Sequence, residues 1–245
     1  MRAIMVLASL VVCVSVVQAD PNSDLVRAVR MKNIELVRVS LKNGADPNQR
    51  LKGNDSVIYP LLQEACFISV QDRKASYEIA RLLIEAQADV NALSSDGNPT
   101  VFSACDNRDT LRLMIDKKAD LSARNRNRDG IIMQAINIGN SSNVEREEII
   151  KMLLDAKADV NAVNSNNETA LIYECRFGRN VKVAGMLIDA GASKTINIRD
   201  RSGWTALMWV KRSMGNNALV EKMKKSGAVF TEEDQQKINQ SMMGG

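Results

Sequence analysis

The stretch KADVNA at residues 157–162 decides the fold, because variants of it recur along the chain. Other copies stand at 44–48 (GADPN), 87–92 (QADVNA), 118–123 (KADLSA), 191–193 (GAS) and 226–229 (SGAV). Their shared alanines are residues 45, 88, 119, 158, 192 and 228, at intervals that scatter around the mid-thirties. Repetition at such a period is typical of solenoids, in which each repeat is one supersecondary unit. The sequence therefore predicts a stack of about six similar units.

Each unit is predicted to hold two helices. Before each copy of the stretch, apolar residues are spaced as on one face of a helix, as in Ile149, Ile150, Leu153 and Leu154. A shorter apolar segment opens the units, at 60–62, 101–103, 170–172 and 206–208. Hydrophobic residues make up 45% of the chain but aromatic residues only 4%, which favours an aliphatic core between thin helical layers.

These units resemble ankyrin repeats, in which a hairpin finger leads into two antiparallel helices. The best matches are NETAL at 167–171 with AGA at 190–192, and GWTALM at 203–208. The resemblance covers about residues 23–230 and implies an all-α fold, an ankyrin-repeat solenoid of about six helix-turn-helix units with β-hairpin finger loops. The repeats would end near residues 48, 91, 122, 161, 195 and 230. A repeat domain at 20–230 would then precede a capping helix and frayed tail at 231–245.

The first 19 residues are predicted to be a secretory signal peptide that is not part of the fold. Arg2 supplies the positive end, an apolar run covers 3–14, and small side chains before residue 20 suit cleavage after Ala19. The chain is therefore expected to be exported, to the periplasm or outside the cell. A membrane-spanning helix and a lipid anchor at Cys13 are weaker alternatives, because the run is short and Val12 is bulky. No other stretch is long and apolar enough to span a bilayer.

The sequence departs from the family by containing no histidine. In ankyrin repeats the first helix usually carries a histidine that ties neighbouring repeats together by hydrogen bonds. We therefore expect weaker polar ties between units, with the histidine position taken by Leu62, Ser103, Gln134, Ile172 and Met208.

The glycine that usually follows the second helix is also replaced in the middle units, by Gln87, Lys118 and Lys157. This position takes a left-handed backbone conformation, which costs a residue other than glycine up to about 1 kcal/mol. We therefore expect the middle of the stack to be only modestly stable.

Three cysteines follow the signal peptide, and we expect Cys66, Cys105 and Cys175 to be buried and unbridged. Each falls in a different unit, and packed helices lie about 8–10 Å apart, whereas a disulfide needs its two Cα atoms within about 7 Å. A free reactive thiol or an intermolecular bridge is the alternative.

The absence of histidine excludes Ser-His-Asp and Cys-His nucleophiles and HExxH zinc sites. No CxxC, GxGxxG or P-loop motif is present. The recurrent carboxylates Asp46, Asp89, Asp120 and Asp159 fall at finger bases, where they can accept backbone N–H groups. We therefore expect no enzymatic activity, cofactor or metal site, and a carboxylate pair across two fingers is the remaining enzymatic alternative.

The resemblance implies a protein partner that binds the finger tips and the exposed side of the first helices, which together form a concave groove. Nucleic acid is not expected, because the net charge is only +4 and no aromatic residues are interleaved with the basic ones. The protein is expected to be a monomer. The tip candidates are Lys52, Asp55, Asp96, Asn98, Arg126, Arg128, Asn166, Arg201 and Trp204. The first-helix candidates are Leu62, Gln134, Ile172 and Met208.

Two features of the finger tips stand out. Arg124, Arg126 and Arg128 are predicted on one tip, where they would either meet an acidic patch of the partner or form a solvated loop. Trp204 is either a binding hot spot or packs across the base of its finger, and Trp209 is expected in the core.

Together these observations predict an exported, non-catalytic protein–protein interaction module. The alternative is an immunity or inhibitor protein that blocks a toxin or an enzyme in the periplasm.

Overall fold

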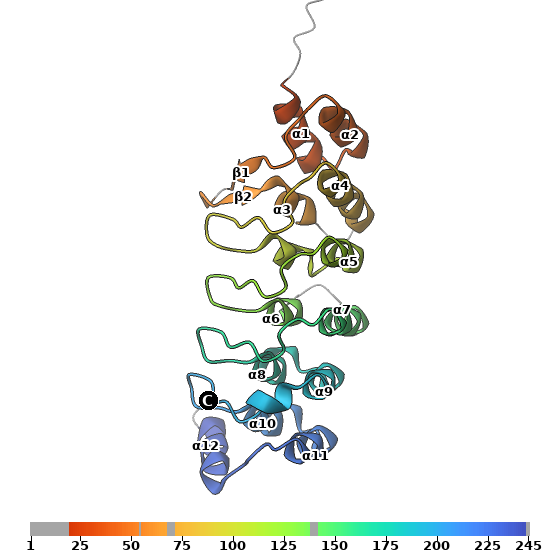
Figure 1. Cartoon of the computed structure of the whole chain (residues 1–245). Coiled ribbons are helices and arrows are strands. Elements are labelled where there is room, and N and C mark those ends of the chain that lie inside the picture. The colour runs from red at the N-terminus through yellow and green to blue at the C-terminus, as the bar shows by residue number, and fades with distance from the viewer. Residues whose placement is uncertain (1–19, 54, 68–71, 138–141, 244–245) are drawn as a thin grey trace, which may run out of the picture.

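The chain forms an elongated stack of helix pairs (Figure 1). The computed structural model describes residues 20–53, 55–67, 72–137 and 142–243. The first helices of the units lie along the middle of the stack, the second helices on one side and the finger loops on the other. The predicted helical solenoid is confirmed, whereas the predicted signal peptide lies outside the described residues.

Six units follow one another in the described part of the chain. The first three are α1 (Pro21–Arg30) with α2 (Ile34–Lys42), α3 (Leu61–Cys66) with α4 (Arg73–Glu85), and the 3₁₀ helix η2 (Thr100–Ala104) with α5 (Arg108–Asp116). The fourth is α6 (Ile131–Ile136) with α7 (Asn143–Asp155). In the last two, the first helix continues as a π-helical turn: α8 (Ala170–Tyr173), η3 (Glu174–Gly178) and α9 (Val181–Asp189), then α10 (Ala206–Trp209), η5 (Val210–Met214) and α11 (Asn217–Lys225).

Two further helices lie outside these pairs. A short 3₁₀ helix, η4 (Ala192–Thr195), follows α9, and α12 (Glu232–Met243) ends the stack. Thr231 and Asp234 form the expected capping box, because each backbone N–H is bonded by the other side chain, at 3.0 and 3.2 Å. The helix runs to Met243, so almost the whole of the predicted segment 231–245 is helix, and Met242 and Met243 do not belong to a frayed tail.

The fingers are narrow hairpins tied to one another by backbone hydrogen bonds. In the first, β1 (Arg50–Lys52) pairs antiparallel with β2 (Ile58–Pro60), and later fingers keep only single bridges, Leu93 with Pro99 and Val163 with Thr169. Ser95 N–H donates to the Ile58 carbonyl at 2.7 Å. Similar bonds of 2.8 Å join the fingers further along, from Ser165 to Asn127 and from Arg201 to Asn166.

The turn after each second helix is left-handed, which confirms the register of the repeats. Gln87, Lys118 and Lys157 have φ of 72°, 65° and 65° at the position where the other units have Gly44, Gly191 and Gly227. The finger-base aspartates also behave as predicted, since Asp46, Asp89, Asp120 and Asp159 each accept the backbone N–H two residues on, at 2.8 to 2.9 Å.

The expectation of weak polar ties between units is wrong, because asparagines make them at the finger bases. The amide oxygen of Asn48 accepts from the N–H of Asp89 in the next unit at 2.8 Å, and its amide nitrogen donates to the Gln87 carbonyl at 3.2 Å. Asn197 repeats both contacts one unit before the end of the stack, with Val229 and Gly227. These bonds join neighbouring units without histidine.

The core is aliphatic and continuous along the stack. Cys66, Cys105 and Cys175 are buried in it and unbridged, as predicted. Burial raises the pKa of the Cys66 thiol to about 12 and raises that of the other two as well, so these thiols are not poised to act as nucleophiles.

The predicted histidine position was placed wrongly in three units. Counting three residues from the N-cap of each first helix (Pro60, Pro99, Gly130, Thr169 and Thr205) gives Gln63, Phe102, Met133, Ile172 and Met208. All five are buried, at 6% exposure or less. Leu62 is one residue too early, and Ser103 and Gln134 one too late, because short apolar runs without a cap signal do not fix the start of a helix.

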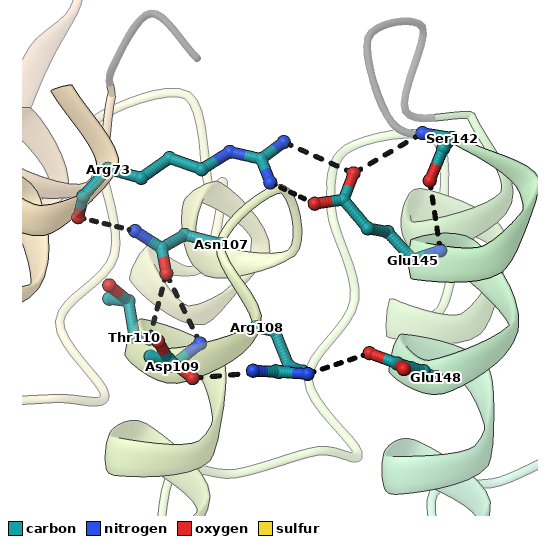
Figure 2. A network of polar contacts seen from close by, with 8 residues as sticks. All are labelled: Arg73, Asn107, Arg108, Asp109, Thr110, Ser142, Glu145 and Glu148. Carbon is teal, nitrogen blue, oxygen red and sulfur yellow. Dashed lines mark hydrogen bonds and ion pairs between the residues drawn. The ribbon is translucent and has the colours of Figure 1, made fainter. Parts of the chain in front are cut away.

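Units 2 to 4 share a network of polar contacts on the side of the second helices, which we call the outer face (Figure 2). Helices α4 and α7 have 13 residues each and α5 has nine. As a result, Arg73 of α4 reaches over α5 and pairs with Glu145 of α7, while Arg108 at the start of α5 pairs with Glu148 at 2.8 Å. Unit 2 therefore contacts unit 4 directly, although units of a solenoid normally contact only their neighbours.

Candidate functional site

A row of partly exposed side chains runs along the first helices, beside the fingers. Four residues beyond each N-cap stand Glu64, Ser103, Gln134, Tyr173 and Trp209, all of which are partly exposed. We call the surface formed by this row and the finger loops the inner face. Of the predicted first-helix candidates only Gln134 lies in the row. Leu62, Ile172 and Met208 are 1%, 1% and 0% exposed, so the structure contradicts their assignment to the binding surface.

An aromatic–arginine cluster occupies the inner face of units 5 and 6, and consists of Tyr173, Arg176, Phe177, Trp209 and Arg212. The rings of Tyr173 and Phe177 lie 4.8 Å apart. The guanidinium of Arg176 is 4.6 Å from the Phe177 ring centre and 5.0 Å from that of Trp209, and Arg212 lies 5.7 Å from the latter. The cluster therefore joins two successive units, and Phe177 at 52% exposure is its most accessible ring.

Trp204 is buried and Trp209 is partly exposed. Trp204 is 6% exposed and packs with Met208 and with Ile238 of α12, which confirms packing over the hot-spot alternative. Trp209 was expected in the core but is partly exposed beside Trp204, with ring centres 4.6 Å apart. The capping helix produces this outcome, because it covers the finger base from a position about thirty residues further along the chain.

Buried carboxylates hold the cluster in place from below. Asp200 is 5% exposed, and its Oδ2 accepts a hydrogen bond from Nε1 of Trp209 at 3.0 Å. Its Oδ1 accepts the N–H groups of Ser202 and Trp204, which closes the turn of the finger. Glu168 is 1% exposed and forms an ion pair of 2.6 Å with Arg176. Buried carboxylates thus hold the indole of Trp209 and the guanidinium of Arg176 in place.

A small pocket connects the cluster to the finger tips. It has a volume of about 180 Å³ and is lined by Asn166, Arg201 and Ser202 of the fingers, by Arg176 of the first helix, and by Glu168 and Asp200. Asn166 and Arg201, two of the predicted tip residues, are therefore brought together, and a backbone hydrogen bond joins them. The pocket has room for about one side chain of a partner.

The arginine-rich finger of unit 4 exposes two of its three arginines at its tip. Arg124 forms an ion pair of 3.1 Å with Asp159 at the base of the next finger, so it does not belong to the tip. Arg126 and Arg128 are exposed as predicted. The sequence predicts all three arginines on the tip, because the ion-pair partner of Arg124 lies 35 residues away and no local pattern reveals it.

The earlier fingers hold less accessible polar groups. Asp96 and Asn98 were predicted at a tip, but Asn98 Nδ2 donates to Asp96 at 2.6 Å and both are partly buried. The hydroxyl of Ser94 also donates to Asp96, and these bonds and the nearby Arg126 lower the pKa of the Asp96 carboxyl. Lys52 and Asp55 are exposed on the first finger, far along the stack from the cluster (Figure 1).

A buried acid that the sequence did not reveal lies at the end of the first helix of unit 5. Glu174 is 0% exposed, and its Oε1 accepts the N–H of Asn180 at 2.6 Å. Its Oε2 has no hydrogen-bond partner among the described residues. Burial raises the pKa of Glu174 to about 7, although the Asn180 N–H and the charge of Arg146 oppose the shift. This carboxyl therefore titrates near neutral pH.

The outer face has two shallow pockets of about 450 and 460 Å³ over α4, α5 and α7. Their walls are ion-paired residues such as Arg108 and Glu148. In the part of the chain that the structure describes, no group of three or more acidic, cysteine or histidine side chains could hold a metal ion. None of the helices in the described ranges is long and apolar enough to cross a membrane.

A comparison with protein families finds a match in the C-terminal half of the chain. Residues 132–234 match the family model described as ankyrin repeats in three copies. This part of the chain is therefore similar to ankyrin repeats. It comprises units 4 to 6 and includes the whole aromatic–arginine cluster. The search of curated proteins found no match.

The ankyrin pattern explains why the cluster was missed. Tyr173 and Arg176 follow the buried Ile172 in the first helix, at positions where the structure leaves side chains partly exposed. Once the N-cap threonines Thr169 and Thr205 fix the register, the same count leads to Trp209 and Arg212. The signal was present in the sequence, but it required these two caps to be recognised.

Proposed function

We propose that this chain is an exported, non-catalytic protein-binding module that uses the inner face of its ankyrin repeats. The observation that carries the proposal is the aromatic–arginine cluster on units 5 and 6. Tryptophan, tyrosine and arginine are the residues most enriched at the energetic centres of protein interfaces. A partly exposed cluster of all three, beside a pocket of side-chain size, suits a partner's surface better than it suits solvent.

The cluster is held rigid before any partner arrives. Asp200 fixes the indole of Trp209, and Glu168 fixes the guanidinium of Arg176. Side chains that are already ordered lose less conformational entropy on binding, which raises affinity for a given contact area. This arrangement supports binding as the role of these residues.

The experiment is affinity capture with the full chain and the variants Arg212→Ala and Trp209→Ala. We expect a specific partner to be retained by the wild type and lost by both variants. Arg212 forms no ion pair in the described ranges and lies over the two indoles, so we expect its removal to affect binding more than stability, which thermal unfolding of the variant checks. Tyr77→Ala, which removes a partly exposed aromatic residue from the outer face, is the matched control and should retain the partner. Equal loss of the partner by Tyr77→Ala would contradict an inner-face site.

Export is part of the proposal and is supported by the leader pattern of residues 1–19. Cleavage after Ala19 would leave Asp20, whose side chain accepts the N–H groups of Asn22 and Ser23 and so caps α1. N-terminal sequencing of the protein from periplasmic and medium fractions should give Asp20 as the first residue. A cytoplasmic protein that keeps Met1 would overturn this part.

A narrower form of the proposal is that the partner is a toxin or an enzyme and that binding blocks it. The same capture decides between the two, because a stoichiometric complex that abolishes the partner's activity supports inhibition. A complex in which the partner stays fully active would rule out inhibition and support the scaffold function.

A further inference from the structure

The acidic side chains on the inner face of units 4 to 6 are all engaged inside the protein. Glu168 and Asp200 bind Arg176 and Trp209 from below. The two oxygens of Asp129 accept from Asn164 and Asn125, at 2.8 and 3.0 Å. Glu168 and Asp200 are buried and Asp129 is partly buried.

The arginines on the same surface point the opposite way. Arg126, Arg128, Arg201 and Arg212 are exposed, and none of them forms an ion pair in the part of the chain that the structure describes. The guanidinium of Arg201 donates to the Ser165 carbonyl, at 3.1 Å, and that of Arg212 lies over the rings of Trp204 and Trp209 at 5.3 and 5.7 Å. Carboxylates that face inward and guanidinium groups that face outward give this surface a positive potential.

We propose that the inner face of units 4 to 6 binds an acidic segment of its partner protein. Carboxylates of that segment pair with Arg126, Arg201 and Arg212, and an apolar side chain between them contacts the exposed ring of Phe177. This inference rests on the proposed function and names the chemistry of the partner.

Charge complementarity is strengthened by the aromatic surroundings of Arg212. A guanidinium that lies on an indole keeps its edge N–H groups free for a carboxylate, which it can bind through two parallel hydrogen bonds. The rings also exclude water from one side of the pair, and lower local polarity makes such a bond stronger. The repeat spacing matters too, since Arg126 and Arg201 occupy equivalent turn positions two fingers apart.

A nucleic acid fits this surface less well than a protein segment. Single-stranded nucleic acids stack their bases on open aromatic faces. The ring of Trp209 already contacts Trp204 and lies beneath Arg176 and Arg212.

The positive charge is greatest on the C-terminal units. The first finger carries Arg50 and Lys52 together with the exposed Asp55, and the next finger carries Asp96 and no basic residue. An acidic segment should therefore bind over units 4 to 6 and leave the earlier fingers free.

The test is a selection of random twelve-residue peptides, displayed on phage, against the intact full chain. Selected peptides are then synthesised with a fluorescent label, and their dissociation constants are measured by anisotropy. We expect enrichment of peptides that combine aspartate or glutamate with an apolar residue. Arg201→Gln and Arg212→Gln should each weaken binding about tenfold, and Phe177→Ala should weaken it further.

The matched control removes two positive charges from the outer side of α5, by Arg112→Gln and Lys117→Gln. This variant should bind as the wild type does, and an equal loss would show that only net charge matters and would overturn the inference. Selection of neutral or basic peptides that depend on Trp209 would also overturn it, while leaving the proposed function standing. Tighter binding of a labelled single-stranded oligonucleotide than of any peptide, lost in Arg212→Gln, would overturn it in favour of nucleic acid.

Discussion

Units 2 to 4 and units 5 to 6 use the same repeat scaffold but place their polar chemistry on opposite faces. In the middle units, Arg73, Glu145, Arg108 and Glu148 join α4, α5 and α7 across the outer face. In the last two units the arginines lie on the inner face, against aromatic rings and over buried carboxylates. The comparison indicates that the first set holds the stack together and that the second set is available to a partner.

The two regions also differ in backbone strain and in burial of charge. The middle units have Gln87, Lys118 and Lys157 in left-handed turns, where the fifth and sixth units have Gly191 and Gly227. The last two units contain the buried acids Glu168, Glu174 and Asp200. Strain in the middle is thus local and removable, whereas the C-terminal region depends on buried charges that are paired or neutralised.

The largest effect is expected for Glu174→Gln. The pKa of this carboxyl is about 7 in the folded protein and 4.5 for an unperturbed glutamate, so the folded state holds the proton more tightly than the unfolded state. The free energy of unfolding should fall as pH rises from about 4.5 to 7 and then stay level. At pH 8 the variant should be more stable by roughly 3 kcal/mol, with no gain at pH 4, as measured by urea unfolding. The exposed Glu233→Gln is the control, and a gain at pH 4 equal to that at pH 8 would contradict the account.

The second-largest effect is a difference in stability cost between two Arg–Glu ion pairs, one on each face. In the pair of Arg176 with Glu168 the side chains are 33% and 2% exposed, whereas in the pair of Arg108 with Glu148 they are 52% and 48% exposed. Arg176→Ala leaves a buried carboxylate without its cation and should cost about 2 kcal/mol, while Arg108→Ala should cost less than about 0.5 kcal/mol. Thermal unfolding of both variants tests this order, and equal losses would show that the two regions do not differ as we describe.

Backbone strain in the middle units should be removable. Gln87→Gly, Lys118→Gly and Lys157→Gly are each expected to stabilise the protein by about 0.5–1 kcal/mol and to raise its melting temperature. Gly191→Ala is the converse control, because a Cβ there meets no atom within 4 Å and only the φ of 105° opposes it. It should lower the stability by a similar amount, and a rise would refute strain as the cause.

The smallest effect concerns the outer-face network and its dependence on pH. The hydrogen bond from Arg73 lowers the pKa of the Glu145 carboxyl, so the contact contributes above the normal pKa of glutamate and is lost as the pH falls. Arg73→Ala should therefore cost about 0.5 kcal/mol at pH 7 and nothing measurable near pH 3. This dependence is opposite in sign to that of Glu174, and a cost that persists in acid would mean that packing of the arginine stem is responsible instead.

The sequence predicts those features that depend on residues close together along the chain. The left-handed turn at Lys157, the backbone contact of Asp159 and the capping box at Thr231 all follow from neighbours within a few positions. Features that depend on distant residues were missed. Trp204 is covered by Ile238 and Arg124 is drawn away by Asp159, and neither partner can be identified from a local pattern.

Two of the first-helix positions predicted for the binding surface are one residue away from the partly exposed ones. Ile172 and Met208 were chosen in place of Tyr173 and Trp209, and on a helix one position turns a side chain by about 100°. A buried position and a partly exposed one are therefore adjacent in sequence. The caps at Thr169 and Thr205 resolve this ambiguity once they are placed in the structure.

The central claim is that the partner binds the inner face of units 5 and 6. Hydrogen–deuterium exchange of the full chain, with and without its captured partner, tests it most directly. We expect new protection at residues 170–178, 199–205 and 206–214, with none at the starts of α4, α5 and α7. Protection confined to those three helices, with unchanged exchange around Trp209, would place the partner on the outer face and contradict the account.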